Sequence, residues 1–338
     1  MPLSYTAPLN GRPVTISGLG CYLPPRVVTN DELAKTLDTS DQWIRKRTGI
    51  ETRRVLDPGE GSLELALRAA RAALTDSGVP ASEIGMVIVG SIVQDRPMPA
   101  TSALVADQLG CTSAGAFDIG NACSSFLYGL LCAAGAIATG YYEHALVIGS
   151  EAASRLLDWQ DRSTAILFGD GAGAAVVSAA KGRGRIIGFD MGADGSGGEF
   201  LHIPAGGTRT PASRETVAEG MHFIKMNGRE VYKFATRVPA ESAARLLENC
   251  GRGVDEVDLF VPHQANLRII EATTKKLGID PAKVFTNVQR YGNTSAASVP
   301  ICLTEARDQG RLKEGDLVLM TAFGGGLSWG SCLMEWGR

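Results

Sequence analysis

The sequence predicts an α/β fold made of two similar halves, from the order of its apolar runs and from a weak internal repeat. Strand-like runs alternate with helix-like runs along the 338 residues, which is typical of sheets covered on both faces. Residues 78–89 resemble residues 253–261, and each segment follows a helical pattern rich in Ala and Leu. Residues 168–171 and 323–326 both read Phe-Gly-x-Gly. The seam between the halves is predicted near residues 180–184, with chance similarity between α/β units as the alternative.

The predicted elements follow one another along the chain. Helices are expected at residues 63–77 and 126–137. Buried strands are expected at residues 86–89, 145–149, 173–177, 257–261 and 317–321. Residues 202–222 are rich in Gly, Thr, Ser and charged residues, so a mobile surface loop is expected there.

Composition excludes several classes of function. The chain is 44% apolar and 20% charged, which is close to an ordinary globular protein. A net charge of -3 gives no reason to expect nucleic acid or an anionic membrane surface as a partner. Apolar stretches are interrupted well before ~20 residues, so no transmembrane helix is expected. Residues 1–13 are polar and show no export signal.

Cysteine and histidine spacing points away from disulfides and metals. The seven cysteines are odd in number and include no C-x-x-C pair, which favours a reducing cytoplasm. The four histidines include no pair at metal-ligand spacing, so no metal site is expected.

Cys123 stands between a strand-like run and the predicted helix at residues 126–137. The positive end of that helix is expected to lower the pKa of the thiol and favour the reactive thiolate. For a cysteine taken alone, a buried structural role is the more common interpretation.

Two later segments carry the partners that a nucleophilic cysteine needs. His263 follows the apolar run at residues 257–261, and Asn293 lies in Tyr-Gly-Asn-Thr-Ser. A histidine and an asparagine at strand-to-helix loops resemble such partners. Each residue is weak evidence of a catalytic site by itself, because a single His is more often structural and Asn-Thr-Ser is a common helix cap.

Taken together with Cys123, these segments resemble the β-ketoacyl-acyl-carrier-protein synthases III, which are condensing enzymes of the thiolase superfamily. The resemblance runs from about residue 14 to residue 336 and includes Thr-Ser-Asp-Gln-Trp-Ile at 39–44 and Arg-Thr-Gly-Ile at 47–50. It implies a five-layered αβαβα fold of two fused halves. Residues 1–182 would carry the nucleophile and residues 183–338 the His and Asn, with the site between them.

The resemblance implies a two-step decarboxylative condensation. The Cys123 thiolate takes an acyl group from coenzyme A, and malonyl-acyl-carrier protein then loses carbon dioxide and attacks the acyl-enzyme. His263 and Asn293 would stabilise the enolate through a ring N–H and an amide NH2. The backbone amides of Cys123 and Gly325 would form a second oxyanion hole. A thiolase would need a second cysteine as base near residues 323–326, where none is present, and Cys332 is interpreted as a core residue.

Further site residues are implied by the same resemblance. Trp43 and Arg162 match a pair that stacks on the adenine of coenzyme A. Stacking and cation–π attraction would stabilise this arrangement. Arg47 matches a residue that contacts a phosphate. The expected coenzyme A site comprises Trp43, Arg47, Thr48, Arg162, Gly228 and Asn266. The expected docking surface for the carrier protein comprises Lys233, Arg268, Lys275 and Lys276, with a solvated charged face as the alternative. No cofactor is expected beyond the coenzyme A thioester substrate.

The chain departs from familiar members at the acyl pocket. The expected pocket comprises Met98, Phe168, Leu201 and Phe323, and Met98 stands where a Phe often caps the pocket across a homodimer. Because Met is flexible, starters longer than acetyl are expected. The nucleophile also lies in Asn-Ala-Cys-Ser-Ser, where Ala-Ala-Cys-Ala-Gly is common. The alternatives are a thiolase-fold acyltransferase or a polyketide starter-unit synthase; Cys123 argues against a non-catalytic partner subunit.

Overall fold

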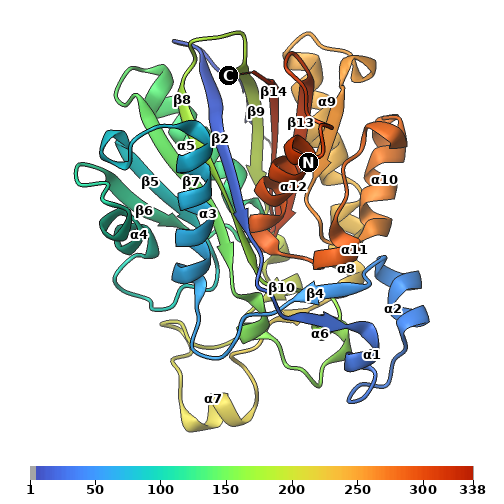
Figure 1. The fold of residues 1–338 in the computed structure, drawn as a ribbon. Helices are drawn as coiled ribbons and strands as arrows, with labels where there is room; N and C mark the ends of the chain where they lie inside the picture. Colours follow the sequence, from blue (N-terminus) through green and yellow to red (C-terminus); the bar gives the residue numbers. More distant parts are fainter. Residues whose placement is uncertain (1–4, 338) are drawn as a thin grey trace.

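A computed structural model describes residues 5–337 and contains two five-stranded sheets that lie side by side (Figure 1). The first sheet is ordered β2 (Val14–Tyr22), β8 (Gly171–Ala179), β7 (His144–Glu151), β5 (Met86–Gly90) and β6 (Gly115–Ile119). The second is ordered β1 (Tyr5–Pro8), β9 (Arg185–Ala193), β14 (Ser328–Glu335), β13 (Leu317–Gly324) and β12 (Leu259–Pro262). The central strands are buried along almost their whole length, as their continuous apolar runs require.

Helices cover both sheets and also separate them. The outer layer on the first sheet contains α3 (Ser62–Ser77) and α4 (Thr101–Leu109), and the outer layer on the second contains α9 (Val238–Asn249) and α10 (Leu267–Leu277). Between the sheets lie α5 (Ser125–Ala138) and α12 (Ser298–Asp308), and each of them contacts both sheets. The expected five-layered αβαβα fold is therefore confirmed (Figure 1).

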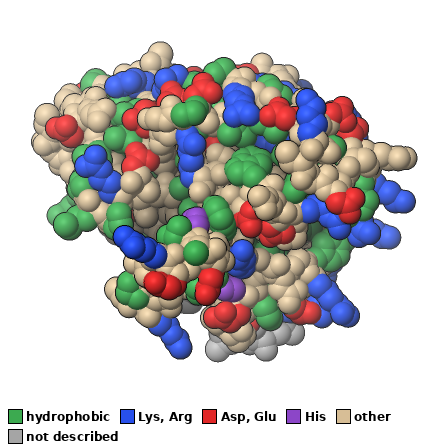
Figure 2. Space-filling model, turned by 90° about the horizontal axis from the view of Figure 1, so that it is seen from below, with side chains coloured by type: hydrophobic (Ala, Val, Ile, Leu, Met, Phe, Trp, Pro, Cys, Tyr) green, Lys and Arg blue, Asp and Glu red, His purple; other side chains and the backbone are tan. Residues whose placement is uncertain are grey.

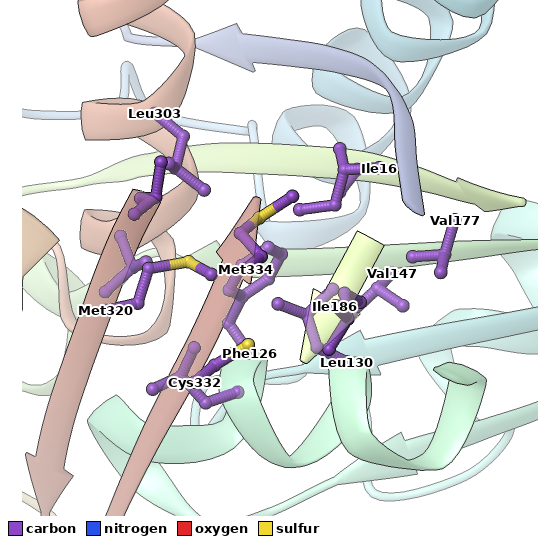
Figure 3. Packing of buried hydrophobic residues seen from close by; sticks show 14 of the residues in the cluster. Ile16, Phe126, Leu130, Val147, Val177, Ile186, Leu303, Met320, Cys332 and Met334 are labelled. Atoms are coloured by element: carbon purple, nitrogen blue, oxygen red, sulfur yellow. The ribbon is translucent and has the colours of Figure 1, made fainter. Parts of the chain in front are cut away.

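The largest hydrophobic cluster joins the two sheets through α5 and α12. Figure 3 shows Phe126 and Leu130 of α5 among side chains from both sheets, including Val147 of β7 and Met334 of β14. Leu303 of α12 closes the same cluster. A helix enclosed in this way has few polar positions, and α5 is accordingly rich in Ala, Leu and Gly. This packing holds the start of α5 rigidly between the halves.

The five predicted strands and the helix at 63–77 are present, within a few residues at each end. Strands β2, β9 and β14 were not predicted. In β2 the strand pattern is weakened by Gly18 and Gly20, which the close approach of α3 requires: a Cβ at Gly18 would lie 2.5 Å from the carbonyl oxygen of Ala73.

The sheets follow the expected division of the chain at residue 182, with one exception. Strand β1, near the start of the chain, pairs antiparallel with β9 in the second sheet. Its pairing is a long-range contact that no local pattern could indicate. The division into two similar fused halves, residues 1–182 and 183–338, stays a prediction.

The mobile surface loop expected over residues 202–222 includes a short helix. The segment contains the helix α7 (Arg214–Ala218), which begins with a capping box between Ser213 and Thr216. It is flanked by the two-stranded ribbon of β10 (Leu201–His202) and β11 (Lys225–Met226), and it lies at the bottom of Figure 1. The capping box lies within a Ser/Thr-rich stretch, which is why composition alone suggested a loop.

The remaining elements surround one end of the two sheets. They are β3 (Val27–Thr29), α1 (Asn30–Leu33), α2 (Asp41–Thr48), β4 (Thr52–Arg54), α6 (Arg162–Ala165), α8 (Gly228–Ala235) and α11 (Val288–Tyr291). Among the helices in residues 5–337, none has the length and apolar character needed to cross a membrane. Seen from this end, the surface carries interspersed acidic and basic side chains and is hollowed beside a group of hydrophobic ones (Figure 2).

Candidate active site

Cys123 lies in a short 3-10 turn (Ala122–Ser124) between the end of β6 and the start of α5. Ala122 has a φ of +46°, an uncommon left-handed conformation that turns the chain sharply before the cysteine. Gly324 of β13 packs against the same turn, because a Cβ there would lie 2.7 Å from the Cys123 backbone nitrogen. The thiol is 6% exposed and is held at the meeting point of the two halves.

The expected lowering of the Cys123 pKa was wrong. Burial raises the pKa of the Cys123 thiol to about 12, because the thiolate loses its hydration. The hydrogen bond to Ser295 opposes this shift, and the neighbouring Glu151 adds to it. The thiol is therefore protonated at neutral pH, and its proton has to leave before or during attack on a thioester.

His263 follows β12 and is held as a neutral donor. The Gln264 backbone N–H donates to Ser298 Oγ at 3.4 Å, and the Ser298 hydroxyl lies 2.6 Å from His263 Nδ1. Either atom of this pair can donate, and in the tautomer in which Ser298 donates to Nδ1 the ring proton lies on Nε2. Nε2 is buried and has no partner within the described chain. Burial lowers the pKa of His263 to about 3, so the ring stays neutral.

Asn293 is oriented by the turn that it begins. Its Oδ1 accepts the backbone N–H of Ser295 at 2.8 Å, which leaves the Nδ2 amino group to donate elsewhere. The Asn293 backbone pairs with the first half, since its N–H donates to the Leu167 carbonyl at 2.8 Å. This pairing fixes Asn293 beside the Cys123 turn although the two residues come from different halves.

Cys123 lines two adjoining cavities. One, of about 210 Å³, is mostly apolar and is lined by Ile92, Ile203 and Ile224 as well as Cys123. The other, of about 170 Å³, is lined by His263, Asn293 and Cys123. The structure thus brings the three predicted catalytic side chains to one cavity wall.

The predicted acyl-pocket residues separate into three groups. Phe168 and Leu201 line both cavities, whereas Phe323 lines only the one shared with His263. Met98 lines neither cavity and is 83% exposed on the surface. The three isoleucines of the apolar cavity were not predicted from the sequence. Ile203 could have been noticed, because it is an apolar residue inside the polar segment 202–222.

Gly325 lies in the turn after β13 and lines the apolar cavity with Cys123. A Cβ at this position would lie 3.0 Å from the Leu201 carbonyl oxygen, so the backbone approaches closely without a side chain. The two residues whose backbone amides are predicted for the oxyanion hole therefore line the same cavity.

The predicted coenzyme A residues lie along α2, α6 and the second cavity. The guanidinium groups of Arg162 and Arg47 stand 4.7 and 5.4 Å from the Trp43 ring centre. Asn266 caps α10 and also donates to the Arg47 carbonyl at 3.2 Å, while Gly228 and Asn266 line the cavity of His263. Thr48 is buried and its hydroxyl donates to the Ile44 carbonyl at 2.8 Å, so its side chain serves to end α2.

The predicted docking residues do not form one cluster around the cavity. Arg268, in the first turn of α10, lies 5.8 Å from the Tyr232 ring centre, and Tyr232 lines the cavity. Lys233 is on the adjacent α8 and pairs with Glu230. Lys275 and Lys276 stand in the last turn of α10, about 10 Å further along the helix axis, and Lys276 pairs with Glu241. Within residues 5–337, no group of three His, Cys, Asp or Glu side chains is arranged to hold a metal ion.

The chain is similar to known condensing enzymes over nearly its whole length. Residues 117–195 and 247–336 match the family descriptions "3-oxoacyl-(acyl-carrier-protein) synthase III" and its C-terminal domain. A β-ketoacyl-acyl-carrier-protein synthase III of Symbiobacterium thermophilum is 52% identical, covering 97% of this chain and 99% of its own.

Solved structures agree with this similarity. The 3-oxoacyl-acyl-carrier-protein synthase III of Aquifex aeolicus is 44% identical, with a TM-score of 0.89 over 96% of this chain and 100% of its own. The priming β-ketosynthase of a polyketide pathway is 35% identical, with the same TM-score over 96% of this chain and 97% of its own.

Proposed function

Because the chain belongs to the 3-oxoacyl-(acyl-carrier-protein) synthase III family, we propose that Cys123, His263 and Asn293 are the residues that carry out its reaction. The enzyme is an acyltransferase that condenses an acyl-CoA starter with malonyl-acyl-carrier protein and so initiates fatty-acid synthesis. One observation carries the assignment of roles: the three side chains line one cavity, and each is held in a chemically distinct state.

The first half-reaction is acylation of Cys123. The sulfur attacks the thioester carbonyl, and the oxygen of the tetrahedral intermediate accepts from the backbone N–H groups of Cys123 and Gly325. The apolar cavity then receives the acyl chain, since Phe168 and Leu201 extend from the thiol along its wall. Trp43, Arg47 and Arg162 hold the nucleotide end of coenzyme A, with Gly228 and Asn266 along the passage and Thr48 supporting the end of α2.

The second half-reaction is decarboxylation and condensation. Malonyl-carrier protein loses carbon dioxide, and the enolate oxygen accepts from His263 Nε2–H and the Asn293 amide. Both groups are suited to this task because the Ser298 hydroxyl lies against His263 Nδ1 and the Ser295 N–H against Asn293 Oδ1, which leaves Nε2 and Nδ2 to donate to the enolate. The enolate carbon then attacks the acyl-cysteine and displaces the Cys123 thiolate.

We also propose that the enzyme is a cytoplasmic homodimer that needs no cofactor beyond the coenzyme A of its substrate. The free state of all seven cysteines supports a reducing compartment. Strand β6 is an edge strand with Phe117 38% exposed, and Met98 is 83% exposed, which supports a partner on this side. Arg268 and Lys233, beside the cavity, are the favoured contacts for an acidic carrier protein, with Lys275 and Lys276 at its edge.

The test of this function is intact-mass spectrometry followed by product analysis. The protein is incubated with a panel of acyl-CoAs, and each acyl group retained on Cys123 is identified by peptide mapping. Malonyl-carrier protein is then added, and the expected product is the 3-oxoacyl-carrier protein with loss of the acyl adduct. An adduct that passes to an alcohol or amine, but never to malonyl-carrier protein, would instead indicate the acyltransferase alternative.

A further inference from the structure

Glu151, at the end of β7, is a buried carboxyl group connected to the nucleophile through one hydroxyl. Its side chain is 0% exposed, and no cation is among the described groups that shift its pKa. The Ser295 hydroxyl donates to Glu151 Oε1 at 2.9 Å, and the Cys123 thiol donates to Ser295 Oγ at 3.3 Å. When Glu151 is ionised, the hydroxyl donates its one proton to the carboxylate and accepts from the thiol, so the chain then runs from sulfur to carboxylate.

The other contacts of Glu151 are weak. Its Oε2 accepts from the Ile92 backbone N–H at 3.3 Å and from the Ser91 hydroxyl at 3.4 Å. Burial raises the pKa of Glu151 to about 8, and the hydrogen bonds from Ser295, Ile92, Ala296 and Ser91 oppose that shift. Keeping a buried carboxyl group ionised without a cation costs free energy, because the charge loses its hydration. Groups of this kind concentrate at functional sites.

Asp170, another fully buried carboxyl group, shows what a structural role requires. Its oxygens accept from the backbone N–H of Leu56 at 2.8 Å and of Ser154 at 2.8 Å, and from the Ser154 hydroxyl at 2.6 Å. These short bonds hold three segments together and lead to no reactive group. The shortest bond of Glu151, in contrast, is the one that leads to Cys123.

We propose that Ser295 and Glu151 form a proton relay that accepts the thiol proton of Cys123 during acylation and returns it after condensation. The proposal rests on the proposed function, since it needs Cys123 to be the acylated residue. Ser295 contacts the reacting sulfur and is a catalytic residue, whereas Glu151 acts through Ser295. His263 is a poor base, because burial lowers the pKa of its ring to about 3.

During acylation a proton moves from the thiol to Glu151 in two transfers. As the S–C bond forms, the Cys123 S–H bond breaks and its proton moves to Ser295 Oγ, whose own proton moves to Glu151 Oε1. The tetrahedral intermediate collapses and releases coenzyme A as a thiolate, which takes a proton from water. Without a base, a thiol with a pKa of about 12 would be ionised in only about one molecule in 10⁵ at pH 7, which is why an acceptor is needed.

Condensation returns the proton. When the enolate carbon attacks the acyl-cysteine, the S–C bond breaks and the electron pair returns to sulfur as a thiolate. Ser295 gives its proton to the sulfur and is reprotonated by Glu151, which is then ionised for the next cycle. The overall reaction consumes one proton, the one taken up by coenzyme A.

The experiment measures acylation of Cys123 by rapid quench and intact mass from pH 6 to pH 10. It compares wild type with Glu151→Gln, Glu151→Asp and Ser295→Ala. The titratable group that faces Glu151 across Ser295 is the Cys123 thiol; its other neighbours are the Ser91 hydroxyl and the backbone amides of Ile92 and Ala296. Because Glu151 has to be ionised to accept a proton, the wild-type rate is expected to rise with pH and level off, with a midpoint near pH 8.

Loss of the relay should slow acylation and change its pH dependence. Glu151→Gln and Ser295→Ala are expected to acylate 10²–10⁴-fold more slowly at pH 8, with rates that keep rising to pH 10 because only the free thiolate reacts. Glu151→Asp keeps a titrating carboxyl group and should restore the plateau at a reduced height. Decarboxylation of malonyl-carrier protein should stay within about twofold of wild type, since His263 and Asn293 are untouched.

Asp170→Asn is the matched control, because it also replaces a buried carboxyl group and should leave the pH profile unchanged. The relay is wrong if Glu151→Gln acylates within threefold of wild type with the same profile. It is also wrong if the variants lose acylation and decarboxylation in equal proportion, or if Asp170→Asn loses the plateau as well. If wild type accepts no acyl-CoA at all, the proposed function fails rather than the relay.

Discussion

The two sides of the active site are held in different ways: Cys123 by a hydroxyl that is bonded to a buried carboxyl group, and His263 and Asn293 by the Ser298 hydroxyl and the Ser295 backbone amide. The thiol donates to Ser295, which donates to Glu151, and burial raises the pKa of both Cys123 and Glu151. His263 and Asn293 are oriented by Ser298 Oγ and the Ser295 backbone. The first side is therefore suited to moving a proton, and the second to donating hydrogen bonds without losing one.

Ser295 serves both sides at once. Its backbone N–H orients Asn293 while its hydroxyl accepts from Cys123, and its φ of +49° makes this double contact possible. Strained non-glycine residues persist where the surrounding structure holds them, and Ala122 beside the nucleophile is the second example. The comparison predicts that substitutions on the two sides should affect different half-reactions.

The largest effect is expected from Cys123→Ala, which removes the nucleophile. No acyl adduct should form with any acyl-CoA, because the proposed covalent intermediate is a thioester of the Cys123 sulfur. Intact mass is the measurement, and Cys132→Ala is the matched control, since Cys132 lies on α5 and is exposed. Alkylation would be a poor readout because that exposed thiol would react as well. An acyl adduct on Cys123→Ala would mean that the nucleophile has been misassigned.

His263→Ala and Asn293→Ala should reduce decarboxylation and condensation by about 10²–10³ each, which is the usual effect of removing one oxyanion donor. Acylation of Cys123 should stay within about tenfold, because its oxyanion hole is made of backbone groups. Rapid-quench acylation and release of carbon dioxide from malonyl-carrier protein measure the two steps separately. Ser298→Ala, which removes the bond to Nδ1 and the longer one from the Gln264 N–H, should cost about fivefold. Equal losses in both steps would contradict the separation of the two sides.

The pH dependence should also differ between the sides. Because burial lowers the pKa of His263 to about 3, the ring is neutral above about pH 4 and remains a donor throughout the working range. Decarboxylation should therefore be flat from pH 5 to pH 9, whereas acylation should fall below pH 8 as Glu151 is protonated. A loss of decarboxylation with a midpoint near pH 6.5 would show that His263 titrates normally.

The sequence indicated the α/β layers because helices and buried strands leave local patterns. It did not indicate that β1 joins the second sheet, since this pairing connects segments about 180 residues apart. The catalytic residues were recognised by resemblance to a family, and their assembly at one cavity could not be derived from spacing. The direction of the shift in the Cys123 pKa was mispredicted. Burial, which depends on tertiary packing, raises the pKa and is the largest of the effects on it.

Glu151 escaped notice for a related reason. The predicted strand ended at residue 149, and a glutamate just beyond a strand is normally solvated. Only the structure shows that the carboxyl group is enclosed by Ile92, Ser91 and the turn at Ser295. Ser295 itself lay in a motif interpreted as a helix cap, so neither member of the relay had a distinctive local signal.

Trp43→Ala should mainly weaken the binding of coenzyme A. The loss of one stacking surface is expected to raise KM for acyl-CoA about tenfold to thirtyfold, with kcat little changed. An acyl-pantetheine, which lacks the adenine, should show no change in KM. Trp159→Ala is the matched control, because both tryptophans pack against the same hydrophobic cluster, and Trp43 is the one with Arg47 and Arg162 over its ring. An equal rise in KM for both substrates would argue against adenine stacking.

The smallest effect is expected at Met98, which tests whether a partner subunit completes the apolar cavity. Met98 is too exposed to line the cavity of its own subunit, so any effect on chain length has to come from contact with a second copy. Met can move aside through its rotatable bonds and Phe cannot, so wild type should accept butyryl to octanoyl starters. Met98→Phe should shift kcat/KM toward acetyl-CoA by roughly tenfold per excluded pair of methylenes. Ile203→Phe fills the same cavity from within one subunit and should give a similar shift without a dimer. If Ile203→Phe changes the preference and Met98→Phe does not, the cavity is closed by one subunit alone.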